Sequence, residues 1–313
     1  MANLQRAPWR LSRLGRKRAG PAAANTGAAS RWLESTLEVA RWDRVRRASA
    51  RWGAWGAALG GLFGVVAYAP ASWVASALSG ATDGHLVLAD AQGTIWSGSA
   101  VSVLTGGPGS RDARSLPGRL SWVMRPRVSG GLGVSIAFTH ACCLNGQPQL
   151  IAHLGLGRIT AHIENSPEGE PGLVGQWPAA WLAGLGTPWN TLDLGGTVRM
   201  TSQGFGLEWV QGRVRVSGQA EVALRNVSSR VTTLDHLGSY RLTIDGQSGN
   251  GSAAINLFTE EGALQLTGSG AWGPGGFHFR GDAAAREAER GALDNLLNII
   301  GRRAGERSII SIG

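Results

Sequence analysis

The sequence predicts a mainly β protein with a single N-terminal transmembrane helix, an antiparallel β-sheet domain and a short C-terminal helix. An uncharged stretch runs from Trp52 to Thr82, which is long enough to cross a bilayer. Beyond it, apolar and polar residues alternate with the period of half-buried strands, and glycine-rich turns separate these runs. We therefore expect a basic cytoplasmic tail at 1–51, a transmembrane helix at 52–73 and a β-rich domain at 74–313.

The positive charge lies almost entirely at the N-terminus. The 313 residues carry a formal net charge of +9. Residues 1–51 contain 12 of the 30 Lys and Arg residues but only three of the 21 acidic residues, so the remainder of the chain is electrically balanced. A basic patch on the main domain, which nucleic-acid binding requires, is therefore not expected.

The ends of the apolar segment resemble membrane interfaces. Trp52 and Trp55 lie at one end, and Tyr68 and Trp73 lie at the other, as interfacial aromatic residues do. A helix from Trp55 to Trp73 would be roughly 27 Å long, close to the hydrocarbon thickness of a bilayer. Pro70 is expected to kink or end the helix near the outer surface.

The distribution of charge also predicts the orientation of the helix. No basic residue follows the segment until Arg111, whereas five precede it closely: Arg41, Arg44, Arg46, Arg47 and Arg51. The positive-inside rule then places the N-terminus in the cytoplasm and the large C-terminal part outside. Residues 75–77 read Ala-Ser-Ala, as at a signal-peptide cleavage site, but the preceding 51 residues are far too long for an n-region. We therefore expect an uncleaved anchor.

Small residues recur along one side of the expected helix. Gly56, Gly60 and Gly64 form two overlapping GxxxG units, a spacing that lets a second helix approach closely. Glycine is also common in membrane helices without such a role. A helix–helix interface and an unpartnered helix both remain open at this point.

Strand and helix positions follow from the apolar periods. The clearest alternation places Val214, Val216, Ala220, Val222 and Leu224 on one face of 213–225, and similar runs occupy 120–124, 132–138, 159–163 and 240–244. A helix is expected over roughly 283–300, with Asp282 as N-cap and Gly301 as its stop. Gly291 is expected to weaken or break that helix. A second short helix is expected at 179–185.

The two cysteines, Cys142 and Cys143, are adjacent. This arrangement is not a disulfide framework, and we expect two small half-buried residues in preference to a strained vicinal disulfide or an intermolecular bond. His140 lies two residues away, with His153 and His162 further along. These residues lack the paired spacing of a zinc site, so no metal site is predicted.

Catalytic constellations are weak in this sequence. It contains no nucleophile elbow, HExxH or Walker A motif. Gly268, Gly270 and Gly273 fit G-x-G-x-x-G, but no βαβ unit surrounds them, so no dinucleotide site is expected. Asp235 and His236 are neighbours without an evident third partner. We expect no enzyme activity and no cofactor.

Seven stretches of the sequence have a familiar order and spacing. They are 70–78 (PASWVASAL), 86–100 (LVLADAQGTIWSGSA), 116–125 (LPGRLSWVMR), 177–196 (WPAAWLAGLGTPWNTLDLGG), 237–242 (LGSYRL), 262–272 (GALQLTGSGAW) and 296–313 (LLNIIGRRAGERSIISIG). Together they resemble the type II secretion system protein N family, and the resemblance covers roughly residues 52–313. The stretches at 88–100 (LADAQGTIWSGSA) and 186–192 (GTPWNTL) are its most specific parts. The family-motif positions are Gly93, Trp96, Gly98, Pro188, Trp189, Asn190, Leu237, Gly238 and Tyr240. The tail is longer than expected for that family, which leaves its role open.

The resemblance implies a non-enzymatic component of the general secretion pathway, which moves folded proteins from the periplasm to the medium. It implies a single-pass protein of the inner membrane with a periplasmic C-terminal domain, and other type II secretion proteins as partners. The family also looks related to AsmA-like envelope proteins, whose curled antiparallel sheets form apolar grooves. That relation implies a curled sheet here and adds lipid as a candidate partner.

Two functional hypotheses follow, and one observation separates them. A secretion component would bind proteins through strand edges or tryptophan-bearing patches. A lipid-handling or envelope-maintenance protein would use the concave face of the sheet as an apolar trough. A filled sheet face favours the first hypothesis, and apolar side chains that face solvent along a groove favour the second. Nucleic acid is not expected as a partner of either.

Overall fold

The computed structural model describes residues 50, 52–128, 131–246, 252–273 and 276–313. The expected basic tail at 1–51 lies outside these ranges apart from residue 50. The chain divides into two compact units, Met1–Gly64 and Val65–Gly313.

A helix covers residues 52–67. In the described part of the chain, no helix combines the length and the apolar character that crossing a membrane requires. The expected continuous span at 52–73 is instead divided, because Pro70 pairs with Thr94 in an isolated β-bridge and the backbone N–H of Ala71 donates to the Gly93 carbonyl at 3.0 Å. The expectation that Pro70 ends the helix is therefore confirmed, whereas Trp73 lies in a second helix, α2 (Ser72–Ala81).

The second unit is built on one antiparallel sheet that contains 16 strands of the described residues. They are β1 (Leu86–Gly93), β2 (Ser97–Thr105), β3 (Ala113–Ser115), β4 (Leu120–Arg127), β5 (Leu132–His140), β6 (Gln149–Gly155), β7 (Arg158–Glu164), β8 (Leu173–Pro178), β9 (Leu194–Val210), β10 (Arg213–Ser229), β11 (Gly238–Asp245), β12 (Ala253–Gly262), β13 (Leu264–Gly273), β14 (Gly276–Ala285), β15 (Arg302–Ala304) and β16 (Arg307–Ile312). The expected mainly β, antiparallel fold is confirmed, and the five predicted strand runs lie in β4, β5, β7, β10 and β11.

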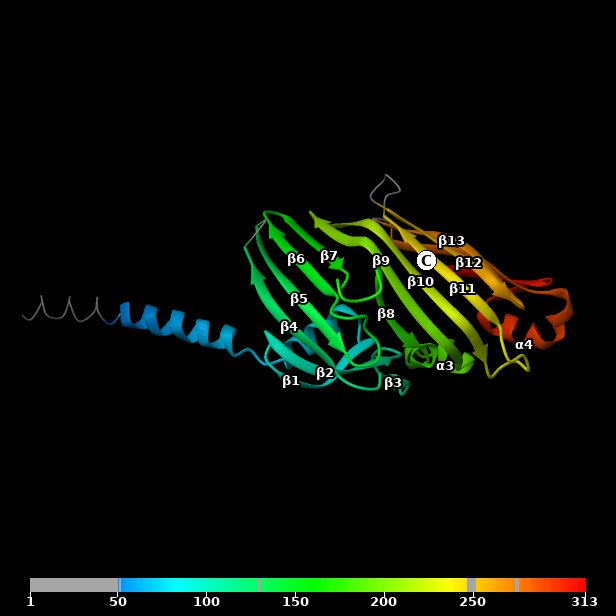
Figure 1. Ribbon diagram of the computed structural model, residues 1–313, viewed down its shortest axis with the longest axis horizontal. Coiled ribbons are helices and arrows are strands. Elements are labelled where there is room, and N and C mark those ends of the chain that lie inside the picture. Colours follow the sequence, from blue (N-terminus) through cyan, green and yellow to red (C-terminus); the bar gives the residue numbers. More distant parts are fainter. Residues whose placement is uncertain (1–49, 51, 129–130, 247–251, 274–275) are drawn as a thin grey trace, which may run out of the picture. The chain divides into compact units, whose positions relative to one another are not determined.

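The strands follow one another across the sheet almost in chain order. The order is β1-β2-β4-β5-β6-β7-β9-β10-β11-β12-β13-β14-β16-β15, with β3 added beside β2 and β8 added beside β9. Figure 1 shows this progression from cyan β1 to orange β13, with β9 and β10 as the long central strands. β7 and β8 pair with different ends of β9, at 206–210 and 197–201 respectively. Short links between sequential neighbours explain this meander.

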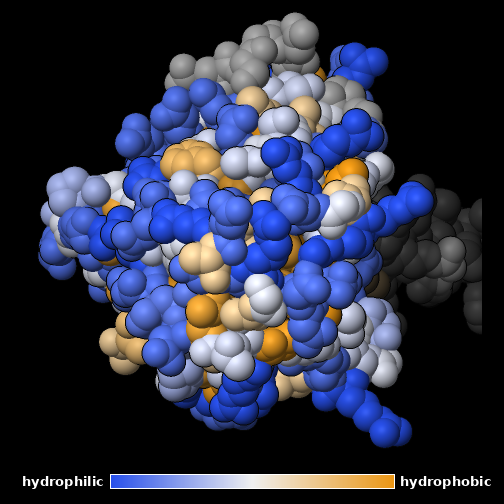
Figure 2. All heavy atoms as spheres, turned by 90° about the vertical axis from the view of Figure 1, so that its right-hand side faces the viewer, coloured by the Kyte–Doolittle hydropathy of each residue, from blue (hydrophilic) through white to orange (hydrophobic). Residues whose placement is uncertain are grey.

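A helix fills the sheet face at the C-terminal end of the unit. Leu293, Leu296 and Leu297 of α4 (Arg290–Ile300) are fully buried. They belong to one apolar cluster with Tyr240 of β11 and Leu264 of β13. The outer surface at this end is mostly hydrophilic with scattered apolar groups (Figure 2). This half of the sheet therefore has a conventional packed core.

The predicted C-terminal helix begins later than expected. Asp282 and the following alanines continue β14, where Ala283 pairs with Leu266 and with Ser308. Asp282 is therefore not an N-cap, and the expectation of helix from residue 283 was wrong because strand pairing on both sides outweighs the helix propensity of alanine. Gly291 does not break the helix, since it lies in the first turn of α4. The short helix expected at 179–185 is confirmed as the 3₁₀ helix η1 (Ala179–Leu185).

A second and smaller apolar cluster lies at the N-terminal end of the unit. It joins Ala71, Leu88, Ala100 and Trp122, and side chains of α2 such as Leu78 pack against it. α2 thus covers the first strands as α4 covers the last ones. The middle of the sheet lies between these two clusters.

Candidate functional site

An apolar cavity of about 340 Å³ lies beside the N-terminal cluster. Its walls come from α2, β1, β2, β4 to β8, η1 and the segments that link them, and include Leu88, Leu120, Phe138, Leu150, Ile163 and Trp177. Its volume is within the range of small-molecule sites, about 300–1,000 Å³. The N-terminal half of the sheet therefore has a cavity on its apolar face, whereas α4 packs against that face in the C-terminal half.

The apolar wall of the cavity continues as an apolar sheet face. Residues that pair directly across strands lie on the same face of a sheet, and Ile136 pairs with Leu150, which pairs with Ile163. Two residues further along each strand, the same face carries Val134, Ala152, Ala161 and Leu207, each paired with the next. The face that lines the cavity is thus apolar across four neighbouring strands.

This face ends in a row of exposed apolar side chains. Leu132 pairs with Leu154, Leu154 with Ile159, and Ile159 with Trp209. Their exposed fractions are 64%, 51%, 47% and 56% respectively. We call these four residues the rim row. An exposed contiguous apolar patch marks an interaction surface more often than a lone exposed residue does.

His140 is a buried polar residue in the wall of the cavity. It ends β5, and only 8% of it is exposed. Its Nδ1 accepts a hydrogen bond from the backbone N–H of Cys142 at 3.4 Å, whereas its Nε2 is buried with no partner among the described residues. Burial lowers the pKa of this imidazole, so the ring is neutral at pH 7.

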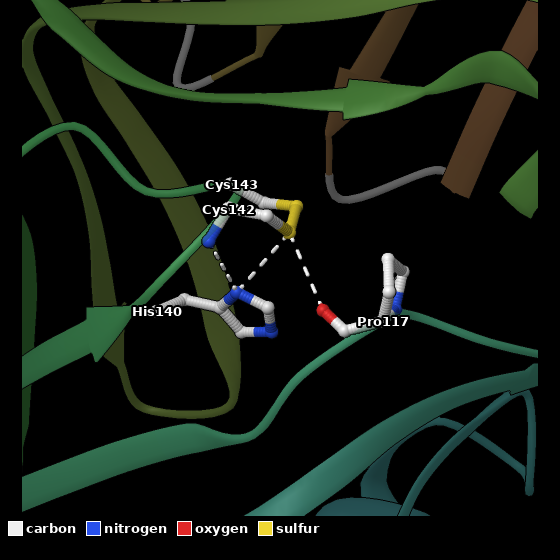
Figure 3. Close-up of a disulfide and its surroundings, with 4 residues drawn as sticks. All are labelled: Pro117, His140, Cys142 and Cys143. Atoms are coloured by element: carbon white, nitrogen blue, oxygen red, sulfur yellow. Dashed lines mark hydrogen bonds between the residues drawn. A yellow bond between two sulfur atoms is a disulfide. The ribbon is translucent and has the colours of Figure 1, made fainter.

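Cys142 and Cys143 form a disulfide (Figure 3). The expectation of two separate half-buried thiols was therefore wrong, because the turn after β5 brings both sulfur atoms to the same side of the chain. Cys143 is buried and Cys142 is exposed. Cys142 Sγ lies 3.3 Å from His140 Nδ1 and 3.4 Å from the carbonyl oxygen of Pro117. The disulfide therefore lies beside Nδ1, on the edge of the imidazole ring away from Nε2.

The other candidate polar residues do not join this cluster. In the described part of the chain, the metal-ligating atoms of His140, Cys142 and Cys143 lie within 4.8 Å of one another, but a disulfide offers no thiolate to a metal. His153 and His162 stack on each other instead, with ring centroids 6.2 Å apart. The remaining candidates lie apart from the cavity wall: Asp235 and His236 are exposed, and Gly268, Gly270 and Gly273 lie within β13.

The first group of family positions shapes the β1–β2 hairpin. Gly93 pairs with Gly98, and a Cβ on Gly98 would lie 2.5 Å from Cζ2 of Trp122. The indole N–H of Trp96 donates to the Val66 carbonyl at 2.9 Å. These residues hold the hairpin against the sheet and the end of the preceding helix.

The second group lies at the start of α3 (Trp189–Leu192). The Thr187–Pro188 peptide bond is cis, and the side-chain amide of Asn190 donates to Asp112 Oδ2 at 2.9 Å. Trp189 is 36% exposed. This segment therefore connects the region after η1 to the loop between β2 and β3.

The third group lies where β10, β11 and β12 approach closely. Leu237 and Tyr240 are buried, and Gly238 pairs with both Val227 and Gly262. The hydroxyl of Tyr240 is buried without a partner among the described residues, and burial raises its pKa. The positions of this group serve packing, and a direct role of any family position in secretion stays a prediction.

The predicted membrane residues are open to their surroundings. A Cβ placed on Gly56, Gly60 or Gly64 would have no atom within 4 Å apart from the adjoining residues and the backbone of its own helix. The expected interfacial residues are also exposed: Trp52 at 80%, Trp55 at 65%, Tyr68 at 81% and Trp73 at 55%. Their assignment as a helix interface and as membrane anchors stays a prediction.

The sequence analysis raised an apolar trough as an alternative but did not identify the residues that form the cavity and the rim row. The strand period identified the apolar face of 132–138 and 159–163, but it does not say which apolar faces a helix will cover. The cue in the sequence was the number of helices: a sheet this long with one C-terminal helix cannot cover its whole apolar face. His140 was considered only as a metal ligand.

The family model for type II secretion system (T2SS), protein N, matches residues 84–310. The chain belongs to the type II secretion system protein N family. The match begins just before β1 and ends within β16, so it spans nearly the whole sheet. Comparison with curated proteins and with solved structures gives no match.

Membership in the protein N family makes this chain a component of the type II secretion system, associated with the cell envelope and with other components of that system. The resemblance found in the sequence is thereby confirmed. His140, the rim row and every cavity-lining residue except Leu78 of α2 lie inside the matched region.

Proposed function

We propose that this protein N family member is a non-enzymatic, single-pass inner-membrane component that supports export of folded proteins from periplasm to medium. The family match over 84–310 carries this proposal. The basic tail would lie in the cytoplasm and the sheet domain in the periplasm, where it would contact other secretion proteins.

The helix at 52–67 supports the membrane anchor. Leu59, Leu62 and Phe63 are exposed by 61%, 62% and 75%, and the described positions of this helix carry no charge. A helix that is apolar on all sides is stable only when lipid or protein surrounds it. At about 25 cal/mol per Å² of apolar surface, transfer of such side chains out of water stabilises insertion substantially.

The first test is the distribution of known exoproteins between periplasm and medium in a strain that lacks this gene. We expect exoproteins to accumulate in the periplasm and to reach the medium again when the full gene is restored. Normal secretion by the deletion strain, under conditions where the other secretion genes are required, would contradict the proposal.

Gly56, Gly60 and Gly64, here called the glycine row, provide a second test of the same proposal. Gly60→Leu should weaken association of the helix, because a bulky side chain keeps the two backbones apart. A reporter of transmembrane self-association in the inner membrane measures this effect. Ala58→Leu is the matched control, since residue 58 lies on the opposite side of the helix. Equal signals from both variants would remove the glycine row as a self-association interface.

A second candidate function is lipid handling in the envelope, and the apolar face between the cavity and the rim row favours it. Leu132, Leu154, Ile159 and Trp209 face solvent, as expected for a trough and not for a filled scaffold. Mass spectrometry of lipids that remain with the purified full-length protein tests this function. Recovery of stoichiometric lipid that is lost in Ile159→Lys would support it, whereas lipid-free protein would exclude it.

A further inference from the structure

Three neighbouring hairpins of the sheet end in exposed apolar side chains. The hairpins β4–β5, β6–β7 and β9–β10 all turn at the same edge, because their strands alternate in direction along the strand order. Val128, directly after β4, is 85% exposed, and Leu156, between β6 and β7, is fully exposed. The rim row lies just inside these turns. We call residues 125–128, 131–132, 154–159 and 208–215 the tip edge.

The tip edge is also basic, although the sheet domain as a whole is electrically balanced. Its single acidic residue, Glu208, pairs with Arg158, with 2.8 Å between Oε1 and Nε. In the described part of the chain, its other arginines have no ion-pair partner: Arg125, Arg127, Arg213 and Arg215. The edge therefore combines outward apolar side chains with an excess of positive charge.

The chain enters this unit at the same edge of the sheet. The unit begins at Val65, and the Val66 carbonyl accepts a hydrogen bond from the indole N–H of Trp96 at 2.9 Å. Trp96 lies in the turn of the β1–β2 hairpin, and its carbonyl accepts from the Met124 N–H of β4 at 2.7 Å. Val128 follows four residues later, about 13 Å further along that strand. The tip edge is thus close to the point where the apolar helix ends.

A membrane surface fits these features better than a protein partner does. Apolar side chains at the tips can enter the boundary between headgroups and acyl chains, while arginines around them contact anionic phosphates. A protein interface usually has an apolar centre enclosed by a polar rim, whereas Leu156 and Val128 project from the turns into solvent. An anchor in the same chain also raises the effective concentration of the bilayer at this edge.

We propose that the tip edge docks on the surface of the membrane that holds the helix at 52–67. Val128 and Leu156 lie in the headgroup region, and the arginines contact the phosphates of anionic lipids. Trp209 suits the same depth, because tryptophan is enriched at membrane interfaces. This docking rests on the membrane anchor of the proposed function and adds a second contact to it, which brings the rim row beside the bilayer.

The depth of a spin label in lipid nanodiscs tests the docking of the full-length protein. Both faces of a nanodisc are open to solution. The nitroxide is attached to Leu156→Cys, since the native cysteines are paired in a disulfide. Oxygen, which concentrates in the bilayer, and a water-soluble nickel chelate are compared as relaxing agents. The discs contain phosphatidylcholine alone or an equal mixture with phosphatidylglycerol.

A control label reports on the opposite edge of the sheet. Asp235 lies in the loop after β10, at the end of that strand away from the tip edge, and is exposed. We expect oxygen to relax the Leu156→Cys label more than the chelate does in discs with phosphatidylglycerol. The Asp235→Cys label should respond mainly to the chelate in both kinds of disc.

Variants of the arginines test the role of charge. Arg127→Gln combined with Arg213→Gln should lower the ratio of docked to undocked protein about 25-fold, at about fivefold for each arginine near an anionic surface. Arg302→Gln combined with Arg307→Gln is the matched control. It removes the same charge from exposed positions at the far end of the strand order and should leave the depth of the label unchanged.

A variant of the tip tests the apolar contact. Val128→Ser should lower the ratio of docked to undocked protein about tenfold, because it removes an apolar side chain from the headgroup region. Val128 is exposed in the fold, so this change should leave the sheet intact, and thermal unfolding of each variant verifies that it is folded.

Co-elution of the protein with the discs separates this docking from the anchor. Protein that co-elutes while its Leu156→Cys label stays accessible to the chelate in both lipid mixtures would overturn the docking and leave the anchor intact. Protein that does not co-elute would overturn both. Equal label depth in neutral and anionic discs would overturn the contact with anionic lipid. A label that is aqueous in the discs but shielded in native membranes would assign the tip edge to a protein partner instead.

Discussion

At the scale of single residues, one of the closest backbone approaches in the sheet lies between Gly238 and Gly262. A Cβ on Gly262 would lie 2.2 Å from Gly238 Cα and 2.3 Å from the Leu237 carbonyl oxygen, and Gly262 has φ +131°. Residues other than glycine rarely adopt this backbone conformation. Gly238 was singled out from the sequence as a family position, whereas Gly262 was not, because only the strand register brings the two together.

Gly262→Ala is therefore expected to destabilise the sheet domain by about 2–4 kcal/mol, from backbone strain and from steric overlap. Denaturant unfolding of the full-length protein, followed by tryptophan fluorescence, measures the change. Gly305→Ala is the matched control, because Gly305 also has a positive φ (+66°) but has no neighbour within 4 Å of its Cβ position. It should cost only about 1–2 kcal/mol. Equal losses would show that contact with Gly238 is unimportant.

The buried imidazole of His140 predicts a dependence of stability on pH. Burial lowers its pKa in the folded protein, so the unfolded chain binds more protons below its own pKa of about 6.5. The stability associated with neutral His140 is thus complete above about pH 6.5 and is lost as the pH falls through the lowered folded pKa. Wild type should lose more thermal stability between pH 7.5 and 5.5 than His140→Gln does. A parallel loss in both proteins would assign the pH effect to other groups.

At the scale of elements, α4 is the main closure of the filled half of the sheet. Its apolar period was evident in the sequence, and Leu293, Leu296 and Leu297 were predicted on one face and are buried there. Its start was not predictable in the same way. The segment from Asp282 to Ala285 has no strong local preference against helix, and only pairing with β13 and β16 makes it a strand.

Leu296→Ala should cost about 2–5 kcal/mol of unfolding free energy, because it leaves a cavity beneath α4 in the C-terminal cluster. Asn298→Ala is the control on the exposed side of the same helix and should change stability by no more than about 0.5 kcal/mol. Both changes can be read from denaturant unfolding of the full-length protein. A small loss in Leu296→Ala would show that the sheet face does not depend on α4.

At the scale of the whole molecule, the sequence predicted the class of fold better than it predicted which surfaces of the sheet are covered. Period-two alternation gave antiparallel strands, and short links made neighbours in sequence neighbours in the sheet. The placement of β7 beside β9, and of β16 beside β14, skips a strand of the chain and depends on pairing that local patterns do not encode. The same limit explains why the cavity was not predicted: its walls come from α2, from seven strands and from η1, which only the complete fold brings together.

The topology of the full chain gives the last prediction. If the segment at 52–67 spans the inner membrane with the basic tail inside, alkaline phosphatase fused after Gly313 should be active, because that enzyme folds only outside the cytoplasm. Green fluorescent protein fused at the same position and exported unfolded should stay dark. Replacement of Arg41, Arg44, Arg46, Arg47 and Arg51 by Glu removes the positive charge that holds the tail inside, and should lower phosphatase activity. Fluorescent fusions with inactive phosphatase in the unmodified chain would show the reverse orientation, with the sheet domain in the cytoplasm.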